Sequence, residues 1–178
     1  MEKIKVLDKH FKLYMSAEEI AKEVERVAME MSRDLRDKKP IIFPVLNGSF
    51  VFAADLVRKL DFDAELSFLK YSSYSGTQTT GEVKKTLNFP KSVEGRHIVI
   101  VEDIIDTGLS IKSALTDLMK LKPSGVSVCT FFFKPDSFRM DYKVDYVGKR
   151  IANDFIVGYG MDYNEYGRFY KDVYVIDE

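Results

Sequence analysis

The sequence predicts an α/β domain with a mostly parallel central sheet flanked by helices. Two observations lead to this prediction. Apolar runs of strand length alternate along the chain with helical patterns, and most of these runs are apolar throughout rather than at every second position. Continuous apolar composition is typical of parallel strands that are buried on both faces. At 178 residues with 46% hydrophobic content, the chain fits one domain with a core of ordinary size.

The first half of the chain is predicted to begin with a long helix. Ser16 and Glu19 form a capping-box pair, and apolar residues then recur at helical spacing up to Arg36. Turn residues and apolar runs define the elements that follow. These are a strand at 41–46, a turn at 47–49, a helix at 51–60, a strand at 65–71, an exposed polar loop at 72–82 and a strand at 83–89.

The second half continues the alternation and then changes character. A strand is expected at 97–101, a helix at 110–121 and another strand at 126–133. From Lys134 onward, the apolar pieces are short and lie among polar and aromatic residues. We therefore expect a single domain over 1–178, with a core at about 16–134 and a small appended subdomain at about 135–178.

Charge and composition exclude several classes of protein. The 27 basic and 28 acidic residues leave a net charge of -1, which gives no general electrostatic reason to bind nucleic acid or an anionic membrane. The sequence favours neither a signal peptide nor a membrane span, so we expect a cytoplasmic protein. The single cysteine, Cys129, cannot form an internal disulfide, and its apolar surroundings predict burial in the core.

The stretch VEDIIDTGLS at residues 101–110 places three acids between an apolar strand and the start of a helix. Ligands bind at the carboxyl ends of parallel strands, and a helix N-terminus favours phosphate. Thr107 and Ser110 can add hydroxyl donors, while Gly108 lets the backbone approach closely. The stretch therefore predicts an anion-binding site.

The three acids admit more than one interpretation. Carboxylates repel a phosphate, so a hydrated Mg²⁺ could lie between the two, or the acids could face the hydroxyls of a sugar. Alternatively, Asp106 only caps the helix or forms a turn, and Glu102 and Asp103 pair with nearby lysines.

The apolar strand, the two acids and D-T-G-x-S together resemble the ribose-phosphate signature of the phosphoribosyltransferases. The resemblance implies that Glu102 and Asp103 bind the ribose hydroxyls and that the following loop binds the 5-phosphate of phosphoribosyl pyrophosphate (PRPP). It assigns PRPP binding to Glu102, Asp103, Asp106, Thr107, Gly108, Leu109 and Ser110.

Four further stretches resemble the hypoxanthine-guanine phosphoribosyltransferases in the same order along the chain. VLNGSFVFAADL at 45–56 is similar to the pyrophosphate loop, in which the peptide between Leu46 and Asn47 can be cis, and SSYSGTQTTGEV is similar to the flexible lid. KPDSF at 134–138 and DFIVGYGMDYNEYGR at 154–168 are similar to the segments that bind the purine. The implied residues are Leu46, Asn47, Gly48, Ser49 and Arg168 for pyrophosphate, Ser73 and Tyr74 for the lid, Lys134, Phe155, Ile156 and Asp162 for the purine, and Glu102, Asp103 and Asp162 for the metal.

The resemblance implies a type I phosphoribosyltransferase fold with a hood built from both chain ends. The implied enzyme is Mg²⁺-dependent, acts in purine salvage as a homodimer or homotetramer, and converts hypoxanthine or guanine and PRPP to IMP or GMP. Chemically, Phe155 could stack on the purine, Lys134 could donate to its 6-oxo group, and Asp106 could hold the N7 proton as N9 attacks the anomeric carbon.

Simpler interpretations apply to single residues, because a phenylalanine such as Phe155 is more often in the core and a lysine such as Lys134 is more often solvated. Asp154 stands where lysine is frequent in the family, which leaves the ranking of the bases open. Asn47 also replaces a frequent lysine, which could alter the affinity for PRPP or a subunit contact. The alternatives are a phosphoribosyltransferase for another base such as xanthine, a regulatory RNA-binding relative of the pyrimidine attenuation type, and an inactive paralogue.

Overall fold

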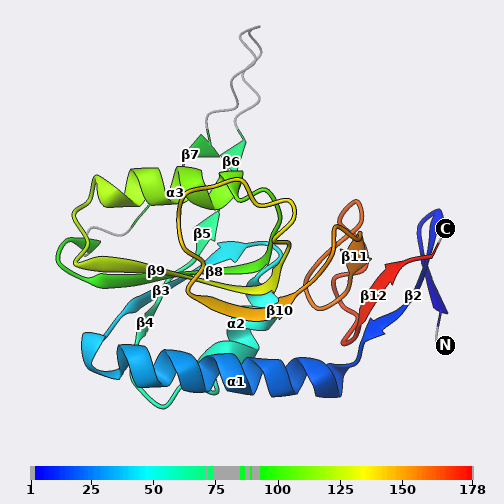
Figure 1. Ribbon diagram of the computed structural model, residues 1–178, viewed down its shortest axis with the longest axis horizontal. Helices are drawn as coiled ribbons and strands as arrows, with labels where there is room; N and C mark the ends of the chain where they lie inside the picture. The colour runs from blue at the N-terminus through cyan, green and yellow to red at the C-terminus, as the bar shows by residue number, and fades with distance from the viewer. Residues whose placement is uncertain (1–2, 71, 74–84, 87–88, 90–92, 178) are drawn as a thin grey trace, which may run out of the picture.

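The computed structural model describes residues 3–70, 72–73, 85–86, 89 and 93–177. A parallel sheet lies between helices, and a smaller antiparallel sheet, the hood, stands at one end (Figure 1). Most of the predicted lid lies outside the described residues. Tyr74 is among those left out, and of Ser73 only the backbone is described. None of the helices in the described part is long and apolar enough to cross a membrane.

The central sheet has the strand order β10-β9-β8-β3-β4, with β5 also pairing with β3, and every pair in it is parallel. The predicted fold class is thereby confirmed. The strands are β3 (Ile41–Leu46), β4 (Glu65–Leu66), β5 (Leu69–Lys70), β8 (His97–Ile105), β9 (Gly125–Phe133) and β10 (Tyr146–Arg150).

Helices cover both faces of this sheet. α1 (Ala17–Leu35), followed by the short 3-10 helix η1 (Arg36–Lys38), and α2 (Phe50–Val57) lie on one face, and α3 (Leu109–Met119) lies on the other (Figure 1). In β8, Ile98 and Ile100 pack in the cluster that includes α3, whereas Val99 and Val101 pack in the cluster that includes α1 and α2. The continuous apolar run therefore supplies both faces, as parallel strands require.

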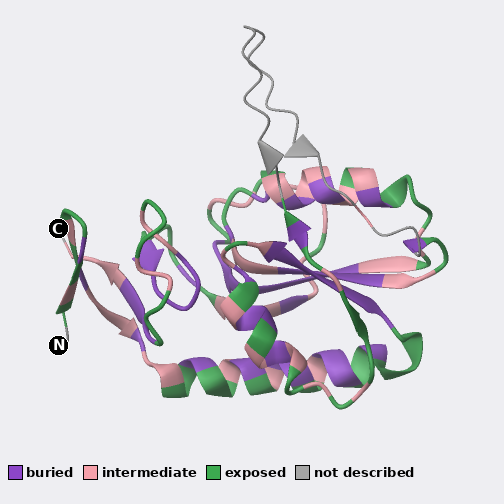
Figure 2. Cartoon of the chain, turned by 180° about the vertical axis from the view of Figure 1, so that it is seen from behind, coloured by how far each residue is buried: buried purple, intermediate pink, exposed green. Residues whose placement is uncertain are grey.

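The core follows from this layering. Figure 2 shows the central strands and the inward sides of the helices as buried, with the exposed residues on the outer sides of the helices and in loops. Cys129 is fully buried, as its sequence setting predicts, and burial raises the pKa of its thiol. The thiol is thus protonated and inert at neutral pH.

The hood brings the two ends of the chain together. Its strand order is β1-β2-β12-β11, with all neighbours antiparallel. The N-terminal segment contributes two of these strands, as the family resemblance implies. Their bounds are β1 (Lys3–Val6), β2 (Lys9–Met15), β11 (Ile156–Val157) and β12 (Val173–Ile176).

The capping-box prediction is confirmed at the start of α1. The side chain of Ser16 accepts from the N–H of Glu19, and Glu19 Oε2 accepts from the N–H of Ser16 at 2.8 Å. The N–H of Ala17 donates to Oδ1 of the buried Asp172 at 2.7 Å. This bond ties the first turn of the core helix to the strand that closes the hood.

Three element boundaries differ from the prediction. β8 continues to Ile105 instead of ending at Val101, because its backbone ladder with β9 runs on through the acidic residues. The strand expected at 65–71 is split into β4 and β5, and the interruption lies opposite Pro44 of β3, which has no N–H to donate. α2 ends at Val57 rather than near residue 60, where Lys59 N donates to Leu56 O in a tighter turn.

Two further predicted segments form different elements in the structure. Of the strand expected at 83–89, the described part forms β7 (Lys85–Thr86), which pairs antiparallel with β6 (Ser72–Ser73). The apolar piece at 146–147 is part of β10, which extends the central sheet beside β9. We therefore propose that the hood begins after Arg150 instead of near residue 135.

We expect Ser16→Ala to lower the free energy of unfolding by about 1 kcal/mol, because the N–H of Glu19 loses its side-chain acceptor. Urea denaturation measures this change. Ser124→Ala is the matched control, since Ser124 is exposed and outside any helix, and it should stay within about 0.5 kcal/mol of the unmodified protein. Equal stability of the two variants would contradict the capping role.

Candidate active site

The predicted site residues gather at one edge of the central sheet, where three neighbouring parallel strands end. β3 ends at Leu46, β8 at Ile105 and β9 at Phe133. Loops that follow the carboxyl ends of adjacent parallel strands lie side by side, which is where open α/β sheets bind ligands. The stretches around residues 46, 106 and 134 therefore meet, although they are far apart in the sequence.

The first of these loops turns sharply after β3. The peptide bond between Leu46 and Asn47 is cis, as predicted from the resemblance. Ser49 is fully buried, and its hydroxyl donates to the carbonyl of Val45 at 2.6 Å. That hydroxyl therefore holds the turn, and the backbone of the loop is what it can offer to a ligand.

Gly48 brings this loop against the acids of β8. A Cβ at Gly48 would lie 1.9 Å from Oδ2 of Asp103, so any other residue here would have to displace that carboxylate or the turn. Burial raises the pKa of the Asp103 carboxyl, while the N–H of Ile104, which donates to it at 3.0 Å, acts in the opposite direction. The loop after β3 and the first acids of the VEDIIDTGLS stretch are thus in direct contact.

The hood contacts the same loop from the other side. Gly160 has a φ of +98°, and a Cβ there would lie 2.1 Å from the carbonyl oxygen of Gly48. The carbonyl of Gly160 accepts from the guanidinium of Arg168 at 2.8 Å, and the same guanidinium lies 2.9 Å from both Asp162 and Glu165. The structure therefore places Arg168 and Asp162 together. Gly160, which Arg168 contacts, links them to the loop after β3.

Asp106 and Lys134 form an ion pair across the ends of β8 and β9. Lys134 Nζ lies 3.0 Å from Asp106 Oδ2, and the lysine side chain is 9% exposed against 49% for the aspartate. Partial burial acts to raise the pKa of Asp106, but the hydrogen bond and charge of Lys134, with the hydroxyl of Ser137, outweigh it and hold that pKa below its ordinary value. Asp106 is thus ionised at neutral pH and does not cap the helix.

Gly108 is the N-cap of α3, and Asp106 lies before it. With a φ of +84°, Gly108 turns the chain into the helix, while Thr107 and Leu109 are exposed at its start. The first N–H groups of a helix have no partner within it and carry its positive dipole end. The residues predicted to bind the 5-phosphate thus surround a helix N-terminus.

Phe155 and Ile156 have different surroundings. Phe155 is 43% exposed, with its ring 6.2 Å from that of Phe11 and 5.9 Å from that of Tyr163. Ile156 is buried in β11 and paired with Val175. Phe155 is therefore held against two aromatic rings while part of its own ring stays exposed to solvent. This arrangement suits stacking on a ligand better than a core position does.

Sequence reasoning missed the segment that surrounds the phosphate loop. The side chains of Phe138, Met140 and Tyr142 lie around Gly108, and the hydroxyl of Tyr142 donates to its carbonyl at 3.0 Å. These residues follow Lys134 in a stretch without regular structure, so no periodic signal marks them. The contact of Gly160 with the loop after β3 was also missed, although the pattern GYG carries it.

The acidic side chains at the site are the candidate ligands for a metal ion. In the part of the chain that the structure describes, no group of three or more His, Cys, Asp or Glu side chains could hold a metal ion alone. Glu102 and Asp103 nevertheless present neighbouring, half-buried carboxylates at the site. This set fits Mg²⁺, which is commonly held by one or two carboxylates with substrate oxygens and water completing the shell.

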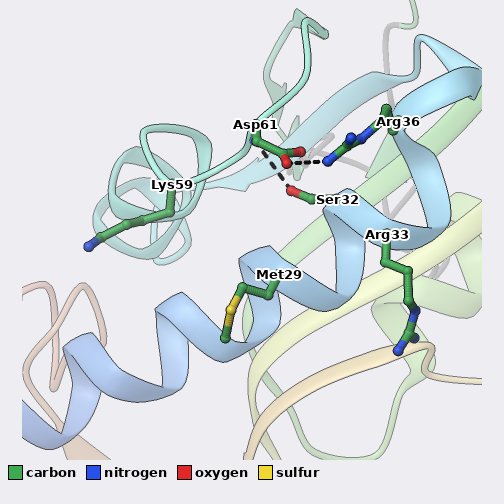
Figure 3. A pocket seen from close by; sticks show the side chains of 6 residues that line it. All are labelled: Met29, Ser32, Arg33, Arg36, Lys59 and Asp61. Atoms are coloured by element: carbon green, nitrogen blue, oxygen red, sulfur yellow. Dashed lines mark hydrogen bonds and ion pairs between the residues drawn. The ribbon is translucent and has the colours of Figure 1, made fainter.

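A separate cavity of about 490 Å³ lies away from these residues. It borders the last turns of α1, toward the amino ends of the strands, and Figure 3 shows Arg36 paired with Asp61 at its wall. The residues around it are Met29, Ser32, Arg33, Arg36, Lys59 and Asp61. None of them was predicted for the site, and we assign the cavity no role in it.

Comparison with known proteins agrees with this geometry. Residues 13–164 match the phosphoribosyl transferase domain family. The chain is 34% identical over 172 residues to the hypoxanthine-guanine phosphoribosyltransferase of Aquifex aeolicus, a match that covers 96% of this chain and 97% of that protein. The chain belongs to the hypoxanthine-guanine phosphoribosyltransferase family. The resemblance seen in the motifs is confirmed.

Two further members of the hypoxanthine-guanine phosphoribosyltransferase family extend the comparison. The hypoxanthine-guanine-xanthine phosphoribosyltransferase of Tritrichomonas foetus is 36% identical over 165 residues, covering 92% of this chain and 90% of that protein. A solved structure of the hypoxanthine phosphoribosyl transferase of Trypanosoma cruzi has a TM-score of 0.84 at 30% identity, covering 98% of this chain and 95% of that one. Sequence and fold thus place the chain in the same family.

We expect Lys134→Met to raise the pKa of Asp106, because the hydrogen bond and positive charge that lower it are removed while partial burial remains. Carboxyl ¹³C NMR across a pH titration measures the change. A lowered carboxylate pKa favours folding above the unfolded pKa, and this contribution is lost as the pH falls through the folded pKa. The variant should therefore show a weaker loss of stability on acidification.

Ser137→Ala is the control for this variant, because Ser137 also acts to lower the pKa of Asp106 and the substitution leaves the lysine in place. It should raise the same pKa by less than Lys134→Met does. An Asp106 pKa that does not move in Lys134→Met would contradict the ion pair.

Proposed function

We propose that this chain is a purine salvage enzyme that transfers the phosphoribosyl group of PRPP to N9 of hypoxanthine or guanine, giving IMP or GMP and pyrophosphate. The observation that carries the proposal is the Asp106–Lys134 pair, 3.0 Å apart at the start of the phosphate loop. One site thereby offers a cation for the 6-oxo group of a purine beside a carboxylate for its N7. Family membership supports the same reaction.

The purine would lie between Phe155 and the Asp106–Lys134 pair. The open face of Phe155 supplies a stacking surface that tolerates any base. Selection then depends on Lys134, since an ammonium donates to a 6-oxo group and finds no acceptor in a 6-amino group. Ser137, three residues after Lys134, donates to Asn153 at 2.6 Å, which holds the chain before Phe155 beside the lysine.

The phosphoribosyl group would lie along the VEDIIDTGLS stretch. Glu102 and Asp103 accept from the ribose hydroxyls, and the N-terminus of α3, with Thr107 and Ser110, binds the 5-phosphate. Mg²⁺ would be held by the ribose oxygens, water and these two acids, with Asp162 as a further predicted ligand. When bound, the ion neutralises charge on the pyrophosphate group as it leaves.

The pyrophosphate would lie over the turn at Leu46 to Ser49, with its backbone N–H groups as donors. Arg168 supports this part of the site from the hood through the carbonyl of Gly160. The predicted lid residues Ser73 and Tyr74 would close over the reacting carbon and exclude water, which would otherwise hydrolyse PRPP.

Asp106 would take the proton from N7 as N9 forms its bond to the anomeric carbon. Its pKa lies below the ordinary value because Lys134, with the hydroxyl of Ser137, outweighs the effect of burial, so the carboxylate is ionised and can accept. Activity that depends on this group should fall as the pH drops through its pKa. The lysine thus both recognises the base and keeps its neighbour ready to accept.

Assembly and base preference are part of the proposal. We expect a homodimer or homotetramer in the cytoplasm; the solved Trypanosoma cruzi enzyme was studied for the role of its C-terminal region in oligomeric state and activity. Xanthine is a second candidate base, because the Tritrichomonas foetus relative is named for three bases. Asp154, next to Phe155, would place a negative charge near the purine. The order of preference among hypoxanthine, guanine and xanthine is therefore to be measured.

The reaction is tested by incubating purified protein with PRPP, Mg²⁺ and one of hypoxanthine, guanine, xanthine or adenine. We expect IMP and GMP to form and adenine to be refused, because Lys134 requires a 6-oxo acceptor. Failure to form IMP from hypoxanthine would overturn the proposed function.

We expect Asp106→Asn to slow turnover by about 10²-fold or more while PRPP still binds, because the variant keeps the shape of the side chain and loses the base. Steady-state rates and calorimetric PRPP titration measure the two effects. Asp136→Asn is the matched control, since Asp136 is exposed in the same region and has no proposed contact with substrate. Unchanged turnover in Asp106→Asn would remove this residue from the proton transfer.

We expect Gly48→Ala to weaken PRPP binding by roughly 10-fold or more, because the new Cβ would lie 1.9 Å from Asp103 Oδ2 and must displace the carboxylate or the turn. Gly95→Ala is the control: its Cβ meets nothing within 4 Å, although its φ of +70° costs stability. Calorimetric titration with PRPP and Mg²⁺ should separate the two. Equal PRPP affinity in both variants would contradict a tight contact at Gly48.

A further inference from the structure

Residues 134–142, which we call the buttress segment, touch each residue of the turn that leads into α3. Lys134 pairs with Asp106 at 3.0 Å, the N–H of Arg139 donates to the carbonyl of Thr107 at 3.4 Å, and Tyr142 donates to the carbonyl of Gly108 at 3.0 Å. Contacts at three successive residues, two of them to backbone carbonyls, hold both the conformation of this turn and its place in the fold.

Tyr142 also packs closely against Gly108. A Cβ at Gly108 would lie 2.8 Å from the tyrosine oxygen and 2.6 Å from the ring of Phe138. The Tyr142 ring packs edge-on against Phe138, with 5.1 Å between ring centroids. Burial, with the nearby charge of Glu102, raises the pKa of the Tyr142 hydroxyl, so it stays a donor at neutral pH.

The direction of two carbonyl groups decides what the turn can bind. A helix N-terminus attracts an anion through its N–H groups, whereas a carbonyl oxygen turned toward the anion repels it. The carbonyl of Gly108 accepts from both Tyr142 and the N–H of Lys112, and that of Thr107 accepts from Arg139. Both oxygens are thereby already hydrogen-bonded within the protein, and the bond from Lys112 directs the carbonyl of Gly108 along α3, away from the helix N-terminus.

We propose that Tyr142 is a positioning residue for the 5-phosphate site: its hydroxyl fixes the Gly108 carbonyl so that the N–H groups at the start of α3 face the phosphate. This inference rests on the proposed function, because it assumes that a phosphoribosyl group binds there. Tyr142 touches neither the purine nor the reacting atoms in this account. Its effect should therefore reach only ligands that carry the 5-phosphate.

The test replaces one hydroxyl group. Tyr142→Phe keeps the ring against Phe138 and removes the donor to Gly108. Tyr146→Phe is the matched control, because Tyr146 is a buried tyrosine whose hydroxyl reaches Asp34 of α1 at 3.4 Å instead of the turn before α3. Both variants should fold, and thermal unfolding checks that they do.

Calorimetric titration with three ligands in the presence of Mg²⁺ gives the decisive comparison. In Tyr142→Phe, we expect PRPP and ribose 5-phosphate to bind about fivefold to tenfold more weakly, the scale of one lost hydrogen bond, while inorganic pyrophosphate binds as before. Steady-state rates should show a raised KM for PRPP with an unchanged KM for hypoxanthine. Tyr146→Phe should match the unmodified protein in all of these.

Two results would overturn the inference. One is unchanged affinity of Tyr142→Phe for PRPP and ribose 5-phosphate, and the other is equal weakening of all three ligands, which indicates general damage to the site. Failure of the proposed function is a separate result, because unmodified protein would then bind no PRPP and form no IMP.

Discussion

The ion pair between Lys134 and Asp106 is the interaction on which the rest of the site depends. It joins the end of β9 to the loop after β8 across 3.0 Å, so that in our proposal the parts of the site that bind the base and the phosphate share this contact. Because the lysine is nearly buried while the aspartate is half exposed, the pair presents its acidic side to the ligand. Lys134 lowers the pKa of the carboxylate beside it, and in our proposal the same cation recognises the purine.

Close backbone contacts connect the remaining parts to this pair. Gly48 lies against Asp103, and Gly160 lies against Gly48. The turn after β3 is thus held between an acid of β8 and the hood. Arg168 fixes Gly160 from within the hood. In our account, the two acids at 102 and 103 hold the ribose while Asp106 serves the base, which gives a separate role to each part of the acidic stretch at the end of β8.

The sequence predicted what depends on local pattern and on order along the chain. The capping box at Ser16 and the bounds of β3 are local, and the acidic stretch is a continuous motif; each was found where expected. The sequence did not predict that β8 runs on to Ile105, because backbone pairing ignores side-chain polarity. The contacts of Tyr142 were also missed, because they join residues 34 apart in sequence through a loop without period.

A crystal structure with bound IMP tests the central claim most directly. The account predicts Lys134 at hydrogen-bond distance from the 6-oxo group, Asp106 facing N7, and the 5-phosphate at the N-terminus of α3. The ribose hydroxyls should face Glu102 and Asp103. A nucleotide with its base away from Lys134, or with its phosphate at the turn after β3, would contradict this division of roles among the three acids.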